Sequence, residues 1–375
     1  MVVRAVEEEK MLVQGNEAIG WGALAAGCLH FYGYPITPQN EVIEWFAREL
    51  PERGGRFVQG ESEAAVMNML LGAAMAGVRV VTSTSSVGFD LMQESLSHAA
   101  AAQLPCVIVN VQRGGPGGGS TQHSQMDYLQ VTRGGGNGGY KNIVLAPSSV
   151  QETSDLMQLA FYLADKWRSP IIVLTDAIVG QTAEILQRKV LDFGPLPDKD
   201  WALRGKAQQK EGKRNLAMCA PSRQSPVITD FLSSTWLLAI KELGEKWEQM
   251  EKTEVRYETY KIDDARLIVV AFGYVARISK KAVDMARSEG LKVGLLRPIT
   301  LWPFPYEVIR DKARRGCKFV VAEDNLGQML WDVRYAVEGK TDVGFVGILD
   351  RHSNSPGGMI LPDRVLAEAK KMLGV

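Results

Sequence analysis

The sequence is poor in the residues that hold metal ions and clusters. Only four cysteines and four histidines occur in 375 residues. No cysteine pair has the CxxC spacing of a zinc site, and no run has the spacing of iron–sulfur ligands. The sequence therefore predicts a reduced protein with no metal site of its own. The cysteines are Cys28, Cys106, Cys219 and Cys317.

The sequence also has no excess of charge of one sign and no long apolar run. Lys plus Arg (43) equals Asp plus Glu (43), so the net charge gives no electrostatic case for binding nucleic acid or an acidic membrane. No apolar run approaches the roughly 18 residues of a membrane span, and the start, MVVRAVEEEK, does not resemble a signal peptide. We therefore expect a cytoplasmic protein that does not enter the membrane.

The first half of the chain alternates between apolar strands and helical segments. Helices are expected at 39–50, 61–77, 89–103 and 149–167. Continuous apolar strands between helices are typical of a parallel sheet that is covered on both faces. The expected strands are 31–36, 56–60, 78–84, 105–112, 142–147 and 170–176.

The pattern fades after about residue 190 and returns near Arg266. Four further apolar strands then alternate with helices. We predict an α/β doubly wound domain over 1–190, a charged linker with a helix at roughly 228–252 over 191–257, and a smaller, separate α/β domain over 258–375.

One glycine motif invites a nucleotide-binding interpretation. GGGNGG at 134–139 matches GxGxxG, which must follow a strand and open a helix to bind a dinucleotide. Here it follows a helical segment and precedes a strand, so we expect no nicotinamide site.

The ligand site is expected where the parallel strands end, because open α/β sheets bind ligands outside the carboxyl ends of their strands. These loops are dense in hydroxyls, carboxylates and glycine, and one carries Arg113. They are 37–40, 60–64, 83–88, 112–127 and 175–180.

Two residues in these loops are unusual for their surroundings. Thr37 lies between Pro35 and Pro38, which restrict the backbone around one hydroxyl. Its plainer interpretation is an N-cap of the 39–50 helix. Glu63 opens an almost wholly apolar helix, where an unpaired carboxylate is costly. Its plainer interpretation is stabilisation of the helix N-terminus, which Glu61 could also provide.

The histidines divide by position. His30 and His98 are expected to pack in the core, whereas His123 lies in the glycine-rich loop, where packing and function are equally plausible.

Four motifs resemble one known family. They are GNEAIGWGALAAG…YGYPITPQNEV, ESEAAVMNMLLGAAMAGVRVVTSTSSVGFDLMQE, LPCVIVNVQRGGP and APSSVQE. In this order they resemble the α subunit of 2-oxoacid:ferredoxin oxidoreductases, nearest to the branched-chain (3-methyl-2-oxobutanoate) type. The likeness covers residues 11 to about 190 strongly. It implies a thiamine-diphosphate-enzyme pyrimidine-binding domain, followed by a domain resembling the transketolase C-terminal domain.

The resemblance also implies partners. The family decarboxylates a 2-oxoacid with thiamine diphosphate, passes electrons to ferredoxin and forms an acyl-coenzyme A. This chain has no GDG…N diphosphate motif and no cluster cysteines. The resemblance thus implies a β subunit with the diphosphate and Mg²⁺ site, and γ and ferredoxin-like δ subunits. Iron–sulfur clusters and coenzyme A handling would lie on those partners.

Site roles follow by position in the family motifs. Glu63 would bond the cofactor's pyrimidine nitrogen, while Thr37 and Arg113 would bind the substrate's oxo and carboxylate groups. Pro35, Ile36 and Ser86 would contact the cofactor, and Thr121 and His123 would set substrate specificity. A bidentate arginine suits a carboxylate, although Arg113 could equally form a surface ion pair.

Three other functions stay open at this point. A 2-oxoglutarate-type α subunit would need a second cation for the distal carboxylate, and the loop offers only His123. A non-catalytic scaffold subunit is disfavoured by the intact Thr37, Glu63 and Arg113. A self-contained transketolase-like enzyme or decarboxylase is disfavoured by the missing diphosphate motif.

Overall fold

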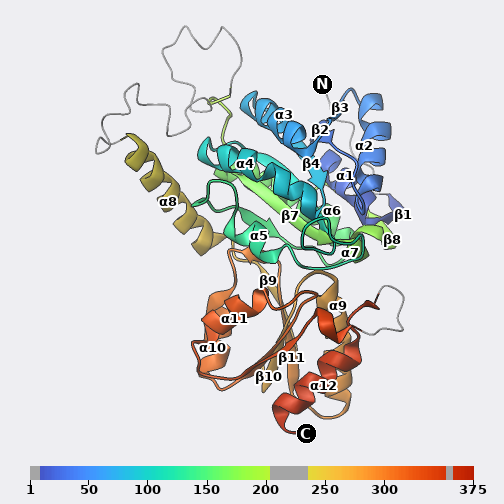
Figure 1. Ribbon diagram of the computed structural model, residues 1–375, viewed down its shortest axis with the longest axis vertical. Coiled ribbons are helices and arrows are strands. Elements are labelled where there is room, and N and C mark those ends of the chain that lie inside the picture. The colour runs from blue at the N-terminus through green and yellow to red at the C-terminus, as the bar shows by residue number, and fades with distance from the viewer. Residues whose placement is uncertain (1–8, 203–234, 352–357) are drawn as a thin grey trace.

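Two largely parallel sheets organise the chain, one above the other in Figure 1. The computed structural model describes residues 9–202, 235–351 and 358–375. Cys219 and the middle of the predicted linker, 203–234, lie outside the described residues. The predicted α/β class, with a second and smaller α/β unit, is confirmed.

The first sheet has the strand order β12-β6-β7-β5-β4-β2-β3 within the described residues. Neighbouring strands are parallel except for the β12–β6 pair. β5 and β7 are buried along their whole length, as central strands between two helical layers must be. The strands are β2 (His30–Gly33), β3 (Arg56–Gln59), β4 (Val80–Thr84), β5 (Cys106–Gln112), β6 (Ile143–Leu145), β7 (Pro170–Asp176) and β12 (Thr300–Trp302).

Two groups of helices cover this sheet (Figure 1). α3 packs on α4, and α1 packs on both α6 and α2. In α2 the buried residues recur at helical spacing, because Val42, Trp45, Phe46 and Leu50 share one face. The helices are α1 (Gly15–Ala25), α2 (Asn40–Glu52), α3 (Glu63–Met75), α4 (Ser86–Ala101), α5 (Tyr128–Arg133), α6 (Val150–Trp167) and α7 (Ala177–Gln181).

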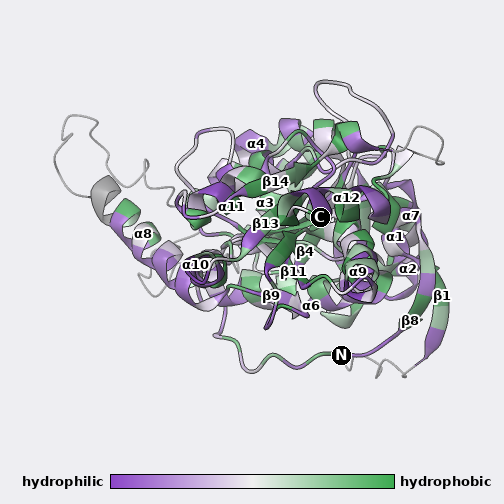
Figure 2. Ribbon diagram, turned by 90° about the horizontal axis from the view of Figure 1, so that it is seen from below, coloured by the Kyte–Doolittle hydropathy of each residue, from purple (hydrophilic) through white to green (hydrophobic). Residues whose placement is uncertain are grey.

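The second sheet has the order β14-β13-β10-β11-β9, with β9 antiparallel to β11. α9 packs on α12 at one side and α10 on α11 at the other. Viewed from below, the strands are largely hydrophobic, and the helices around them carry both hydrophilic and hydrophobic residues (Figure 2). The elements are β9 (Tyr257–Tyr260), β10 (Leu267–Val270), α9 (Gly273–Ser288), β11 (Val293–Pro298), α10 (Tyr306–Arg314), β13 (Lys318–Ala322), α11 (Met329–Val337), β14 (Val343–Val346), a 3-10 turn (Ile348–Asp350) and α12 (Pro362–Leu373).

Several element ends differ from the sequence prediction. β2 ends at Gly33 rather than at residue 36, since Pro35 has no N–H to donate to a sheet. α4 begins at Ser86, three residues earlier than expected. A ribbon of β1 (Lys10–Gln14) and β8 (Ala183–Gln187) was not predicted.

The two α/β units are joined by a strand pairing. β12 follows the second unit's β11 in the chain but pairs with β6 of the first sheet. Its three residues were too few to show a strand pattern in the sequence. The residue ranges proposed for the two domains remain a prediction, with α8 (Thr235–Thr253) between them. Across the described segments, no helix is long and apolar enough to cross a bilayer.

Candidate active site

The strand register brings three of the predicted loops to one edge of the first sheet. Thr84 at the end of β4 lies opposite Asn110 of β5, and Gln112 at the end of β5 lies opposite Asp176 of β7. The residues that follow these strand ends therefore share the carboxyl edge, as expected for a parallel sheet.

The turn after β2 is fixed by hydrogen bonds of a buried side chain. The buried Gln39 side chain donates to the Tyr34 carbonyl at 3.1 Å and accepts a hydrogen bond from Ser83 Oγ at 2.5 Å. Thr37 lies exposed between these anchors, and its bond to Pro38 is cis. α2 begins at Asn40 with Gln39 in the N-cap position, so the interpretation of Thr37 as the helix cap is wrong.

Glu63 is a buried carboxylate without a partner. It is the first residue of α3 and only 5% exposed, yet no group in the described parts of the chain donates a hydrogen bond to it. The N-cap bond of α3 is supplied by Ser62, whose Oγ accepts from Ala65 N at 3.3 Å. A buried carboxylate is costly unless it is hydrogen-bonded. This one is therefore suited to a ligand that brings a donor.

Gly88 provides the space that Glu63 occupies. A Cβ at position 88 of α4 would lie 2.4 Å from Glu63 Oε1 and 2.3 Å from Thr84 Oγ1. Both distances are too short for any side chain, so the glycine allows the carboxylate to reach the sheet edge.

Gly88→Ala should therefore disturb the site more than the fold. We expect turnover to fall about tenfold, because a displaced catalytic group loses its alignment. Gly72→Ala in neighbouring α3 is the matched control, since nothing lies within 4 Å of a Cβ there. That change should leave turnover intact and stabilise the chain by about 0.5–1 kcal/mol. Steady-state kinetics and thermal unfolding of both variants test this, and equal turnover in both would contradict the role of Gly88.

Arg113 has no ion-pair partner among the described residues. Its Nη1 donates to the Thr37 carbonyl at 3.0 Å and its Nη2 to the Gly118 carbonyl at 3.1 Å, while Nε is buried without a partner. The interpretation of Arg113 as part of a surface ion pair is wrong. The structure instead brings the uncompensated guanidinium next to the backbone of Thr37.

Ser86 is engaged within the protein. Its Oγ donates to Asp127 Oδ2 at 2.6 Å and accepts from the Arg113 backbone N–H at 2.9 Å. Burial raises the pKa of the Asp127 carboxyl to about 6, against the opposing effect of hydrogen bonds from Ser86 and Asn110. Ser86 thus fixes the backbone at Arg113, and its expected contact with the cofactor stays a prediction.

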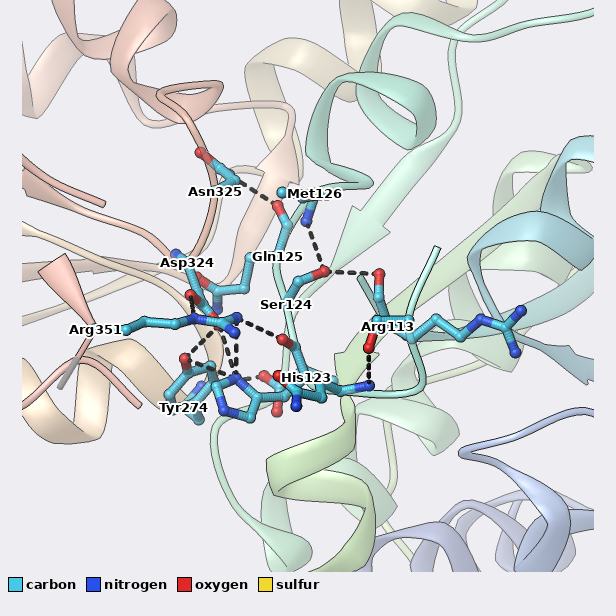
Figure 3. A network of polar contacts seen from close by, with 12 residues as sticks. Arg113, His123, Ser124, Gln125, Met126, Tyr274, Asp324, Asn325 and Arg351 are labelled. Atoms are coloured by element: carbon cyan, nitrogen blue, oxygen red, sulfur yellow. Dashed lines mark hydrogen bonds and ion pairs between the residues drawn. The ribbon is translucent and has the colours of Figure 1, made fainter. Parts of the chain in front are cut away.

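The two predicted specificity residues lie in different surroundings. Thr121 is exposed on the glycine-rich loop. His123 is 5% exposed and its Nδ1 lies 2.8 Å from Asp324 Oδ2 of the second unit. Figure 3 shows the Arg113 side chain pointing away from this histidine. The structure therefore does not bring His123 together with Arg113 and Thr37.

Pro35 is exposed and Ile36 half-buried beside Thr37.

A cavity of about 390 Å³ opens next to this site. Its walls include the start of α4, the loop 115–117, Asp127 and, from the second unit, Leu326 and Gln328. Its charged lining groups are the carboxylates of Asp90 and Asp127. Two carboxylates in its lining would repel a negatively charged ligand group, such as the distal carboxylate of 2-oxoglutarate.

Two family models match the chain. Residues 21–258 match the model described as pyruvate flavodoxin/ferredoxin oxidoreductase, thiamine diphosphate-binding. The chain belongs to this family. Residues 265–356 match pyruvate:ferredoxin oxidoreductase core domain II. The family resemblance predicted from the sequence is confirmed, and the orphaned Glu63 carboxylate fits a cofactor with a hydrogen-bond donor.

Similar proteins include subunits of 2-oxoacid oxidoreductases. The ketoisovalerate oxidoreductase subunit VorB of Methanothermobacter thermautotrophicus is 45% identical, over 97% of this chain and 98% of that protein. A solved 2-oxoglutarate:ferredoxin oxidoreductase from Magnetococcus marinus, with 2-oxoglutarate, coenzyme A and succinyl-CoA bound, has a TM-score of 0.82 and 28% identity. The match covers 98% of this chain and 66% of that one.

A more distant structure shares the fold alone. A split-gene transketolase has a TM-score of 0.60 at 16% identity, over 96% of this chain and 98% of that one. The predicted transketolase-like architecture is thus confirmed.

Several residues of the candidate site are not predicted from the sequence. Gly88 stood in the predicted loop 83–88 but had no assigned role. Asp127 carried a weak signal as an acid after a glycine-rich loop. Ser124 carried none, because its importance depends on the folded path of the loop. Across the described ranges, no group of three or more His, Cys, Asp or Glu side chains is placed to hold a metal ion.

Proposed function

We propose that this chain is the α subunit of a complex that oxidatively decarboxylates a branched-chain 2-oxoacid, 3-methyl-2-oxobutanoate. The products are acyl-coenzyme A and CO₂, and the electrons pass to ferredoxin. One observation carries the proposal. A buried carboxylate without a partner among the described residues, Glu63, and a cation without a counter-ion there, Arg113, follow parallel strands at the same edge of the first sheet.

Each residue then has a role that its surroundings support. Thiamine diphosphate supplies the carbanion-stabilising centre when bound. Glu63 would hold a proton against the pyrimidine ring nitrogen, so that a hydrogen bond joins the carboxyl group to that nitrogen. Arg113 binds the substrate carboxylate through its free N–H groups, and the Thr37 hydroxyl binds the adjacent oxo group. Pro35, Ile36 and Ser86 form the surroundings of the cofactor.

The remaining parts of the reaction require partners. We assign the diphosphate and Mg²⁺ site to a β subunit, and the iron–sulfur clusters and coenzyme A handling to γ and ferredoxin-like δ subunits. The subunit names of the relatives support a multi-subunit complex. The scarcity and separation of the cysteines support a cytoplasmic location.

An uncharged substrate side chain is supported by the loop that follows Arg113. Residues 114–122 contain no basic side chain, and His123 is bound to Asp324. A 2-oxoglutarate-specific site needs a cation for the distal carboxylate. The name of the relative that is 45% identical, a ketoisovalerate oxidoreductase subunit, agrees with this substrate class.

The substrate is tested on the complex purified with its native partners. We expect ferredoxin reduction to depend on coenzyme A, with the highest kcat/KM for 3-methyl-2-oxobutanoate among that acid, pyruvate and 2-oxoglutarate. A highest value for 2-oxoglutarate would overturn the branched-chain assignment and favour the 2-oxoglutarate-type subunit. No activity with any 2-oxoacid would favour a scaffold subunit.

A further inference from the structure

Residues of the second unit form hydrogen bonds with the loop that carries Arg113. The backbone N–H of Gln125 donates to the Asp324 carbonyl at 2.9 Å, and Asp324 N donates back to Gln125 Oε1 at 3.0 Å. Asn325 Nδ2 donates to the Gln125 carbonyl at 2.8 Å, and Gln328 Nε2 to the Met126 carbonyl at 2.6 Å. The segment 123–126 is therefore bonded along the segment 324–328 rather than lying free as a loop.

Asp324 is the centre of this contact. Its fully buried carboxylate accepts hydrogen bonds from Tyr274 Oη at 2.6 Å and Arg351 Nε at 2.7 Å, and contacts His123 Nδ1. Arg351 Nη2 also donates to the His123 carbonyl at 2.5 Å. These bonds from His123, Tyr274 and Arg351 lower the pKa of the Asp324 carboxyl, so the carboxylate stays charged despite its burial.

Ser124 connects this contact to the active site. It lies between His123 and Gln125, and its Oγ donates to the Arg113 carbonyl at 2.7 Å (Figure 3). Ser86 Oγ also binds the Arg113 backbone, because it accepts from the N–H at 2.9 Å and lies 3.2 Å from the same carbonyl. The arginine side chain thus starts from a backbone that both α/β units fix in place.

We propose that Ser124 is a positioning residue for Arg113, and that the second unit sets the position of the substrate-binding guanidinium through it. The inference rests on the proposed function, in which Arg113 binds the substrate carboxylate. It gives the second unit a role in substrate binding.

The test is a double-mutant cycle in the assembled complex. Ser124→Ala should raise KM about fivefold, the equivalent of one hydrogen bond of about 1 kcal/mol. The rise should be equal for pyruvate and 3-methyl-2-oxobutanoate, because both present the same carboxylate. In an Arg113→Lys background, the same change should alter KM by less than about twofold, since residues that act together are not additive.

Two further variants separate positioning from general stability. Thr132→Val removes another buried hydroxyl that donates to a backbone carbonyl at 2.7 Å, that of Tyr128, and should leave KM unchanged. Gln328→Leu removes the bond to Met126 and should raise KM in the same substrate-independent way, by a smaller factor. Equal effects of Ser124→Ala in both backgrounds, or a matching KM rise in Thr132→Val, would overturn the inference while leaving Arg113 as a substrate residue. An unchanged KM in Arg113→Lys alone would instead overturn the assignment of Arg113, and the inference with it.

Discussion

Replacing Glu63 by glutamine should slow turnover of the assembled complex by about 10²–10⁴-fold, the usual cost of losing a positioned proton-transfer partner. The amide keeps the size of the side chain, so the buried space beside Gly88 stays filled. It cannot hold the proton that the pyrimidine nitrogen requires. Proton exchange at the thiazolium carbon of the bound cofactor should slow by a similar factor. The exchange is measured as the rate of deuterium incorporation.

Glu61→Gln is the matched control for this experiment. Glu61 lies two residues away in the same loop but is exposed, and no described residue bonds to it. Its amide variant should exchange and turn over at the wild-type rate. Wild-type exchange in Glu63→Gln would show that Glu63 has no role in cofactor activation.

Arg113→Lys should weaken substrate binding by about 1–3 kcal/mol, which is roughly a 5- to 150-fold rise in KM. Lysine keeps the charge, but its single ammonium nitrogen cannot reproduce the planar fork that reaches Thr37 O and Gly118 O and would bind a carboxylate with two parallel bonds. The loss should be similar for pyruvate and for bulkier 2-oxoacids. Thr121→Ala should instead change the ranking among substrates.

Arg56→Lys serves as the control for a conservative change at an exposed arginine, and its KM should equal that of the wild type. The rise in KM is measured by initial rates of ferredoxin reduction. Should Arg113→Lys leave KM unchanged for every 2-oxoacid, the substrate carboxylate is held by the partner subunit instead.

The local pattern of the sequence was sufficient to predict the parts of the site that lie next to strand ends. Thr37, Glu63 and Arg113 each follow an apolar strand, so the parallel-sheet rule alone places them at one edge. Whether Thr37 caps a helix and whether Arg113 forms an ion pair could be decided only from the three-dimensional structure. Both depend on which side chains meet, and neighbouring residues in the sequence do not reveal that.

Contacts between the two units could not be predicted from local patterns. His123 is predicted to set substrate specificity from its position in the family motifs, on the glycine-rich loop that follows Arg113. Its carboxylate partner, Asp324, is 201 residues away in the chain. For the same reason β12 was missed, because a three-residue strand is defined by its pairing with β6 and not by its own periodicity.

We expect this chain to hold the pyrimidine half of a thiamine diphosphate site that a partner subunit completes. Calorimetric titration with thiamine diphosphate and Mg²⁺ tests it most directly, on the purified single chain and on the complex with its partners. We predict tight binding of the cofactor by the complex and no binding by the single chain. Tight binding by the single chain would contradict it, because the diphosphate and magnesium would then be held without a partner.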